Sequence, residues 1–259
     1  MRAADRFGDQ TSRQIEALYA TPDVAAQRSR IVGALQPGAG ERIADIGCGP
    51  GYLTAEIAEA VGPAGLVHGL DLGPAMVAIA ERRCAGYANC RVEVGDARAL
   101  PFPDATFDAL ASIQVLEHVD DVATAIDEMA RVLRPGGRAV VMATDWDSLV
   151  MESGDRARLE RVVRRWERRS EHAHLPSRLG PLLGEAGLAV EQIAAVPMLN
   201  TVWDEETYAV RIVGMIHDLA RRRGDPAEAD GFFEEQRRLG AKGRFFFCLN
   251  RFLFVARQR

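Results

Sequence analysis

The sequence has few cysteines, and they are scattered. Only four occur in 259 residues, with no CxxC pair and no cysteine–histidine spacing that is typical of a zinc site. A chain of this length can build a sufficient core without disulfides or structural metals. We therefore expect reduced thiols, as in the cytoplasm, and no metal site.

The chain also lacks an excess of basic charge and a long apolar segment. Its net charge is -5 at pH 7, so no overall positive field attracts nucleic acid or an anionic membrane. No run reaches the roughly 18 apolar residues that a membrane-spanning helix needs. The segment MRAADRFGDQ lacks the apolar centre of a secretion signal. These features predict a cytoplasmic protein that neither inserts stably into a membrane nor binds nucleic acid.

The composition and the order of apolar segments indicate an α/β protein. Hydrophobic residues make up 47% and charged residues 27% of the chain, as in ordinary globular domains. Between residues 41 and 144, short apolar runs that end in Gly or Asp alternate with segments of helical period, which is typical of a parallel sheet. The predicted strands are 42–47, 66–72, 90–96, 107–113 and 138–144.

After residue 144 the pattern changes to longer helices and two further strands. The predicted helices are 158–169, 177–187, 204–223 and 226–240, and the predicted strands are 188–196 and 244–256. No linker or internal repeat divides the chain, so we expect one domain over residues 1–259. Its expected parts are a helical lid at 1–40, a core at 41–147, and a region at 148–259 with a helical insertion at about 200–242.

Arginines are concentrated in the predicted helix at 158–169, which is one apparent signal for nucleic acid. Val162, Val163 and Trp166 form an apolar stripe on the opposite side of this helix. That arrangement favours an ordinary amphipathic helix with a solvated basic face.

Three glycines alternate in the segment IADIGCGPG, between a predicted strand and a predicted helix. Gly47, Gly49 and Gly51 allow a ligand to approach the main chain, and the helix N-terminus that follows favours a negative group such as a carboxylate. A dinucleotide loop of the form GxGxxG needs its third glycine at the position of Tyr52. Asp45, two residues before the first glycine, is also outside that fingerprint. The spacing therefore disfavours NAD.

Two further aspartates end predicted strands. Asp71 follows the second strand, where a carboxylate can accept hydrogen bonds from both hydroxyls of a ribose. Asp96 ends the third strand and can accept a hydrogen bond from an exocyclic amine such as N6 of adenine. Aspartates at strand ends commonly cap turns, so each residue alone is ambiguous. Together with Asp45 they predict one crevice that fits a nucleoside.

Five segments in this order make the chain similar to a known family. They are IADIGCGPG, GLDLGPAM, VGDARALPF, FDALASIQVLEHV and RVLRPGG. The chain resembles the class I S-adenosylmethionine-dependent methyltransferases, and within them the type 11 small-molecule group, which includes the quinone-biosynthesis C-methyltransferases. The resemblance implies a Rossmann-like sheet of seven mostly parallel strands with helices on both faces. It also implies that the last strand is antiparallel and inserts beside the fifth.

The resemblance implies a set of cofactor-binding residues at the ends of these strands. The glycines at 47, 49 and 51 would hold the methionine part, and Asp45 would belong to the same site. The other implied residues are Asp71 for the ribose, Leu72 and Met76 beside the adenosine, Asp96 and Ala97 for the adenine, Gln114 near the sulfonium, and Tyr19 in an N-terminal segment that folds over the cofactor. For Gln114 the alternative is a solvated loop residue, and for Tyr19 it is a packing residue.

His118 is the predicted catalytic residue. It follows the fourth strand at the edge of the sheet where open α/β folds bind ligands, and a histidine can take a proton near neutral pH. Its alternative role is to orient the start of the next helix. Asp145 and Asp147 flank Trp146 in a similar position and could bind a cationic acceptor, although a helix cap and a packed indole are the favoured interpretation.

The sequence thus predicts an enzyme that transfers a methyl group from S-adenosylmethionine to a small organic acceptor, leaving S-adenosylhomocysteine. The methyl group on a sulfonium is already activated, so in-line displacement mainly requires an aligned acceptor and the exclusion of water. The alternatives are a non-catalytic protein that binds S-adenosyl nucleosides and an NAD-binding oxidoreductase. The acceptor, the atom that is methylated, the use of a base and the oligomeric state are left open.

Overall fold

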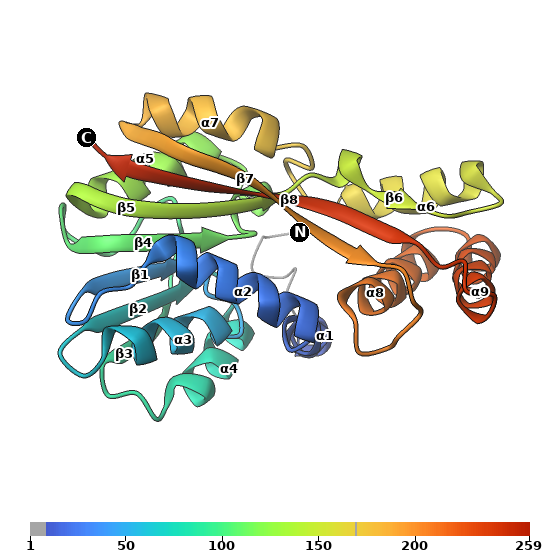
Figure 1. The fold of residues 1–259 in the computed structure, drawn as a ribbon, viewed down its shortest axis with the longest axis horizontal. Coiled ribbons are helices and arrows are strands. Elements are labelled where there is room, and N and C mark those ends of the chain that lie inside the picture. The colour runs from blue at the N-terminus through green and yellow to red at the C-terminus, as the bar shows by residue number, and fades with distance from the viewer. Residues whose placement is uncertain (1–8, 169) are drawn as a thin grey trace.

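A mixed β-sheet forms the centre of the computed structural model, which describes residues 9–168 and 170–259 (Figure 1). Its parallel half has the strand order β3-β2-β1-β4-β5. These strands are β1 (Arg42–Ile46), β2 (Leu66–Asp71), β3 (Cys90–Val94), β4 (Phe107–Ile113) and β5 (Leu133–Thr144). All five strands predicted between residues 41 and 144 are present, and the mostly parallel α/β fold is confirmed.

The C-terminal strands complete the sheet in antiparallel orientation. β8 (Phe247–Gln258) inserts beside β5, as expected, and β7 (Leu188–Asn200) pairs along the other side of β8. A short strand, β6 (Val150–Met151), pairs with the first residues of β8. The described residues therefore form eight strands rather than seven, because β6 was not predicted.

One boundary differs from the prediction in an informative way. Helix α5 (Val122–Val132) ends before the Pro-Gly-Gly segment, but β5 already begins at Leu133. Leu133 pairs with Phe107, and the pairing then shifts so that Arg138 lies opposite Ala109. The segment 134–137 is thus an irregularity within the strand, in which Gly136 has a φ of +77° that suits glycine.

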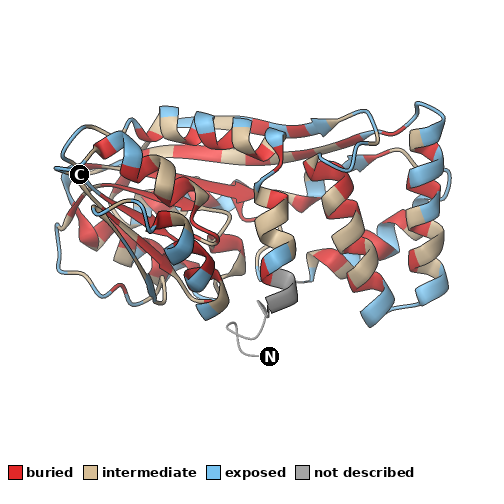
Figure 2. Cartoon of the chain, turned by 90° about the horizontal axis from the view of Figure 1, so that it is seen from below, coloured by how far each residue is buried: buried red, intermediate tan, exposed pale blue. Residues whose placement is uncertain are grey.

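Helices cover both faces of the sheet, with their apolar sides buried and their outer sides exposed (Figure 2). On one face, α2 (Pro22–Leu35) and α3 (Tyr52–Val61) pack against β1, β4 and β5. On the other face, α5 packs against β5, and α7 (Pro176–Glu185) packs against β7 and β8. Helix α4 (Pro74–Cys84) lies against β2 and β3. This layering leaves the carboxyl ends of the parallel strands as the edge that can bind a ligand.

The antiparallel ribbon of β7 and β8 extends beyond the parallel strands and carries a group of three helices at its far end, which we call the cap (Figure 1). The cap consists of α6 (Arg156–Glu167), α8 (Tyr208–Arg223) and α9 (Pro226–Ala241), which share one hydrophobic cluster. The helical insertion predicted at about 200–242 corresponds to α8 and α9. Helix α6 comes from an earlier part of the chain, so two separate segments build the cap.

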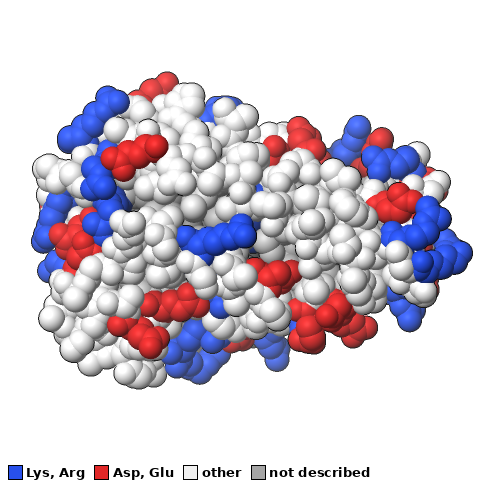
Figure 3. Space-filling view, viewed as in Figure 1, with Lys and Arg blue, Asp and Glu red and all other residues white. Residues whose placement is uncertain are grey.

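The arginines of α6 hold the cap together. Arg161 and Arg165 both form salt bridges with Glu228 of α9, while Val162 and Trp166 on the opposite side of the helix are buried. On the face drawn in Figure 3, basic and acidic side chains are interspersed over this end of the molecule. None of the helices that the structure describes has the length and apolar character needed to cross a bilayer.

Helix α1 (Asp9–Tyr19) connects the core to the cap. Glu16 forms a salt bridge of 2.6 Å with Arg83 of α4, and Gln14 Nε2 donates a hydrogen bond of 3.1 Å to Asp218 Oδ2 of α8. The described part of the expected lid at 1–40 consists of α1, α2 and the turns after them; residues 1–8 lie outside the described part. Helix α1 is therefore positioned across the edge where β1, β2 and β4 end.

Candidate functional site

A large cavity lies at the carboxyl ends of the parallel strands, between the sheet, α1 and the cap. It contains about 1330 Å³ of space, including its open mouth. Most of the predicted site residues line it: Tyr19, Gly47, Gly49, Asp71, Leu72, Met76, Asp96, Ala97, Gln114 and His118. Asp45 and Gly51 are not among the lining residues. One end of the cavity lies over the glycine loop, and the other lies beneath α1 and α8.

Glycine is needed at the three loop positions for different structural reasons. All have positive φ values, from +52° to +78°. A Cβ atom on Gly47 would lie 2.1 Å from Cγ2 of Val115, whereas a Cβ on Gly49 would meet no atom within 4 Å. A Cβ on Gly51 would lie 2.8 Å from that of Ala80. Gly49 therefore leaves open space for a ligand, whereas Gly51 allows the close approach of α3 and α4.

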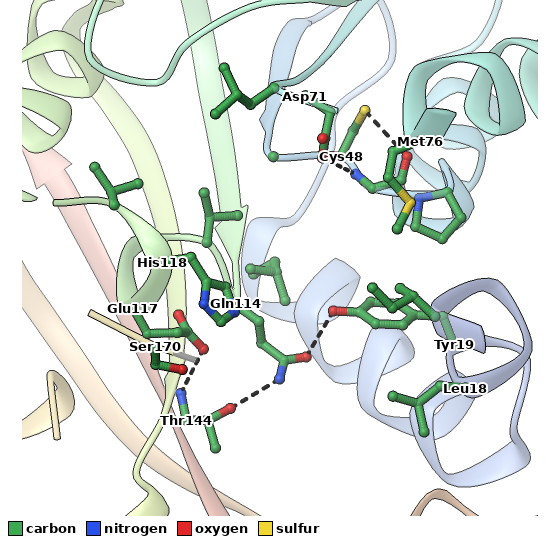
Figure 4. A pocket seen from close by; sticks show the side chains of 18 of the residues that line it. Leu18, Tyr19, Cys48, Asp71, Met76, Gln114, Glu117, His118, Thr144 and Ser170 are labelled. Carbon is green, nitrogen blue, oxygen red and sulfur yellow. Dashed lines mark hydrogen bonds between the residues drawn. The ribbon is translucent and has the colours of Figure 1, made fainter. Parts of the chain in front are cut away.

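Asp71 fastens the glycine loop to the end of β2. Its Oδ2 accepts a hydrogen bond of 2.9 Å from the Gly49 amide (Figure 4), and its Oδ1 accepts one of 2.8 Å from the Gly73 amide. Burial raises the pKa of Asp71, and these two hydrogen bonds oppose that rise. Each carboxylate oxygen retains lone pairs that a ligand hydroxyl can use.

The wall beyond Asp71 combines apolar side chains with a paired carboxylate. Leu72, Met76 and Ala97 contribute apolar surface. Asp96 forms a salt bridge of 2.7 Å with Arg98, whose hydrogen bonds hold the pKa of Asp96 below its usual range. Asp96 is therefore ionised and can still accept a hydrogen bond at the cavity wall.

Asp45 lies beneath the loop rather than in the cavity. It is 2% exposed, and Thr54 Oγ1 donates a hydrogen bond of 2.6 Å to its Oδ2. Burial raises the pKa of Asp45 to about 7, although the Thr54 hydrogen bond acts in the opposite direction. Asp45 thus joins β1 to α3 below the glycines, and any effect on a ligand passes through the position of the loop.

Replacing Asp45 with asparagine is expected to flatten the pH dependence of stability. Because the pKa of Asp45 is raised to about 7 by folding, the folded protein retains a proton that the unfolded chain releases at lower pH. The free energy of unfolding should therefore fall as the pH rises toward 7, by up to about 1.4 kcal/mol per pH unit for this group. Urea denaturation of D45N and wild type across that range measures the difference, with D108N as a control. Parallel curves would contradict the assignment.

Tyr19 and Gln114 close the cavity between α1 and β4. The Tyr19 hydroxyl donates a hydrogen bond of 3.2 Å to Gln114 Oε1, and Gln114 Nε2 donates one of 3.0 Å to Thr144 Oγ1 (Figure 4). Gln114 has a φ of +59°, a conformation that is uncommon outside glycine. Burial raises the pKa of Tyr19 to about 12, so its hydroxyl stays protonated and donates.

His118 lies in the short 3-10 turn Leu116–His118 after β4 and lines the cavity. The start of α5 is capped by Asp121, whose side chain accepts a hydrogen bond from the Thr124 amide. The N-cap of this helix is therefore Asp121, and a role of His118 in orienting the helix start stays an alternative. The catalytic role stays a prediction.

The segment around Trp146 divides between the cavity and the surface. Trp146 lines the cavity and packs edge to face on Trp166, with ring centroids 5.7 Å apart. Asp145 accepts a hydrogen bond from the Asp147 amide, and both carboxylates approach His174 Nδ1, at 3.3 and 3.1 Å. These three groups could hold a cation, but Asp147 and His174 are exposed and none of the three lines the cavity.

The sequence interpretation missed two buried charged residues that line the cavity. Glu117 is 2% exposed and precedes His118, and Arg251 is 1% exposed in the middle of β8. A signal for Arg251 was present, because it and Asn250 interrupt the otherwise apolar run from Phe245 to Ala256. Glu117 was part of the segment FDALASIQVLEHV, but only its burial in the structure makes it a candidate beside His118.

The comparisons with known proteins agree with this architecture. A family model described as a methyltransferase domain matches residues 44–141. An uncharacterized 37.1 kDa protein in transposon TN4556 of Streptomyces fradiae is 35% identical over 251 residues, which cover 93% of this chain and 70% of that protein.

Relatives with named activities match over shorter regions or at lower identity. Demethylmenaquinone methyltransferase of Bacillus licheniformis is 41% identical over 100 residues, 39% of this chain and 43% of the relative. The chain thus spans less than half of that protein's length. The structure of phosphoethanolamine N-methyltransferase 2 of Haemonchus contortus with S-adenosyl-L-methionine has a TM-score of 0.66 and 19% identity, over 100% of this chain and 60% of that one. This chain therefore belongs to the class I S-adenosylmethionine-dependent methyltransferases.

Proposed function

We propose that the glycine loop and the neighbouring strand ends bind S-adenosylmethionine. Gly47 and Gly49 would face the methionine part, Asp71 would accept hydrogen bonds from the ribose hydroxyls, and Asp96 would accept one from the adenine amine. Leu72, Met76 and Ala97 would contact the adenosine. Asp45 and Gly51 would act indirectly, through the position of the loop.

The residues at this end of the cavity suit that nucleoside. The open space beside Gly49 leaves room for a ligand against the main chain, and the half-buried carboxylate of Asp71 can accept hydrogen bonds from hydroxyl groups. The apolar wall is typical of a site for a purine ring. Bound there, S-adenosylmethionine supplies a methyl group that the positive sulfur has already activated.

We infer that the other end of the cavity holds a small organic acceptor. Gln114 and His118 lie at the junction of the two ends, and Tyr19 covers it from α1. These residues would orient the acceptor and exclude water, which dominate the rate of an in-line displacement. His118 remains a candidate for direct contact with the reacting groups.

The observation that carries this proposal is the continuity of the cavity. One cavity extends from the glycine loop and Asp71 to aromatic and aliphatic side chains of the cap, among them Trp166, Tyr208 and Ile212. A protein that only binds the nucleoside needs no second chamber, and an NAD-dependent enzyme needs a different glycine spacing. We therefore favour methyl transfer over both alternatives.

Two measurements test the proposal. Isothermal titration should detect binding of S-adenosylhomocysteine and no comparable binding of NAD. A screen of phenols, quinols, amines and lipids with S-adenosylmethionine should then release S-adenosylhomocysteine for at least one acceptor. Binding of NAD alone would overturn the cofactor assignment, and nucleoside binding without turnover of any acceptor would indicate a regulator.

We further infer that the enzyme acts in the cytoplasm on small molecules rather than on nucleic acid. The interspersed charges and the salt bridges that occupy Arg161 and Arg165 support this inference. The division into a lid at 1–40, a core at 41–147 and a cap-bearing region at 148–259 is likewise a proposal.

A further inference from the structure

Two oppositely charged side chains lie buried at the acceptor end of the cavity. Glu117 comes from the turn after β4 and Arg251 from the middle of β8, 2% and 1% exposed, respectively. Both line the cavity. Burial of a charged group is costly unless a partner compensates it, so their unused hydrogen-bonding capacity points to a ligand.

Glu117 uses only part of its carboxyl group within the protein. Its Oε1 accepts a hydrogen bond of 3.2 Å from the Thr144 amide (Figure 4). Its Oε2 is buried and has no hydrogen-bond partner among the described residues. Burial raises the pKa of Glu117 to about 7, which is suitable for a group that accepts a proton near neutral pH.

Contacts within the protein fix the position of the Arg251 guanidinium but leave one of its N–H donors unused. Its Nη1 donates a hydrogen bond to Gln27 Oε1, and its guanidinium lies 4.5 Å from the centre of the Tyr208 ring. Its Nε is buried and has no hydrogen-bond partner in the described part of the chain. The electrostatic influence of Arg251 extends to both Glu117 and Tyr19.

The remaining walls of this chamber are aromatic and aliphatic. Trp146, Trp166, Tyr208, Ile212 and Met215 line the same cavity. Such walls suit a flat, apolar molecule, and the two charged groups provide a polar contact on it.

We propose that Glu117 and Arg251 form a pair that accepts the proton of an acceptor hydroxyl and stabilises the resulting oxyanion, so that the acceptor is a phenol or an enol. This inference rests on the proposed methyl transfer. It assigns proton acceptance to Glu117 rather than to the adjacent His118.

The chemical step balances with these groups. The hydroxyl proton passes to Oε2 of Glu117, and the negative oxygen is held by the Arg251 guanidinium. A lone pair of that oxygen forms the bond to the methyl carbon while the carbon–sulfur bond breaks and leaves its electron pair on sulfur. Glu117 then releases the proton to water after the methyl ether leaves.

Other acceptor classes fit this pair less well. An ammonium group would be repelled by Arg251, and a carboxylate acceptor arrives ionised and has no proton for Glu117 to accept. A neutral amine lacks the negative charge that Arg251 would stabilise. A weakly acidic hydroxyl is the group that uses both side chains.

The first test is a binding measurement that needs no turnover. In the presence of S-adenosylhomocysteine, wild type should bind 4-nitrophenol at least about tenfold more tightly than 4-nitroaniline, which has nearly the same shape. R251M should lose this preference, and R251K should retain part of it. R257K, on the exposed outer end of β8, is the matched control.

The second test separates proton acceptance from a structural role. E117Q should lower O-methylation of weakly acidic 4-methylphenol by about a hundredfold or more, but should retain activity toward 4-nitrophenol above the pKa of that phenol, because it then arrives ionised. E191Q, on the exposed surface of β7, is the matched control and should resemble wild type. Equal losses for both phenols would overturn the assignment of Glu117.

Three further outcomes would overturn the inference. The first is equal binding of 4-nitrophenol and 4-nitroaniline by wild type. The second is methyl transfer only to amines or thiols. The third is a loss of O-methylation of 4-methylphenol in H118Q but not in E117Q. Titration with S-adenosylhomocysteine accompanies each variant. If wild type fails to bind it, the proposed function itself fails; if binding is intact, the failure concerns this pair alone.

Discussion

Replacing Asp71 with alanine is expected to weaken the binding of S-adenosylhomocysteine by roughly ten- to a hundredfold, on the order of 1.5 to 3 kcal/mol. The substitution would remove the proposed acceptor of the ribose hydroxyls. It would also release the amides of Gly49 and Gly73, which the two carboxylate oxygens hold at 2.9 and 2.8 Å. Isothermal titration of the variant against wild type measures the loss.

A matched substitution shows whether the effect of Asp71 is local. Asp108 lies at the opposite edge of the sheet, where it accepts a hydrogen bond from the Arg42 amide. D108A should therefore bind S-adenosylhomocysteine like wild type, and thermal unfolding shows whether either variant is damaged overall. Unchanged affinity in a folded D71A protein would reject the ribose assignment.

Replacing Gly47 with alanine is expected to lower the free energy of unfolding by about 2 to 4 kcal/mol. At φ = +75° a Cβ atom is strained, and it would lie 2.1 and 2.8 Å from the two methyl carbons of Val115. Neither the buried loop nor the turn after β4 can move without disturbing the site. Urea denaturation at equilibrium measures the change.

Gly49 provides the control for this prediction. It also has a positive φ, +52°, but a Cβ there meets no atom within 4 Å. In G49A the free energy of unfolding should fall only by the cost of the backbone conformation, about 1 kcal/mol. Its methyl group would occupy the space proposed for the cofactor and so reduce the affinity for S-adenosylhomocysteine. Equal destabilisation by G47A and G49A would show that the contact with Val115 is unimportant.

Glu117 and His118 show that residue type alone does not identify every candidate for proton transfer. Histidine attracts attention because its ordinary pKa is near neutrality. Glutamate becomes comparable only when it is buried: the pKa of Glu117 is raised to about 7 chiefly by loss of solvent. Burial depends on contacts with distant segments, such as the Thr144 amide and β8, and no pattern around residue 117 encodes it.

Asp45 and Gly51 show a related difference. Their spacing in the motif predicts a shared place with the other loop residues, and they are indeed adjacent to it. In the structure both positions serve packing: Asp45 accepts a hydrogen bond from Thr54, and the absence of a side chain at Gly51 allows Ala80 to approach. Only the contact between α3 and α4 distinguishes such support from direct contact with a ligand.

That the glycine loop and the aspartates after β2 and β3 line one end of a cavity was predictable from sequence, because these parts are local. Parallel strands place their carboxyl ends at one edge, so a glycine loop and aspartates that follow successive strands must converge. The acceptor end depends on tertiary structure, because Tyr19, Glu117 and Arg251 come from three distant segments that the β7–β8 ribbon, α1 and the cap bring together. Local patterns determine which face of a helix or strand is buried, but the packing of remote segments decides which buried groups share a cavity.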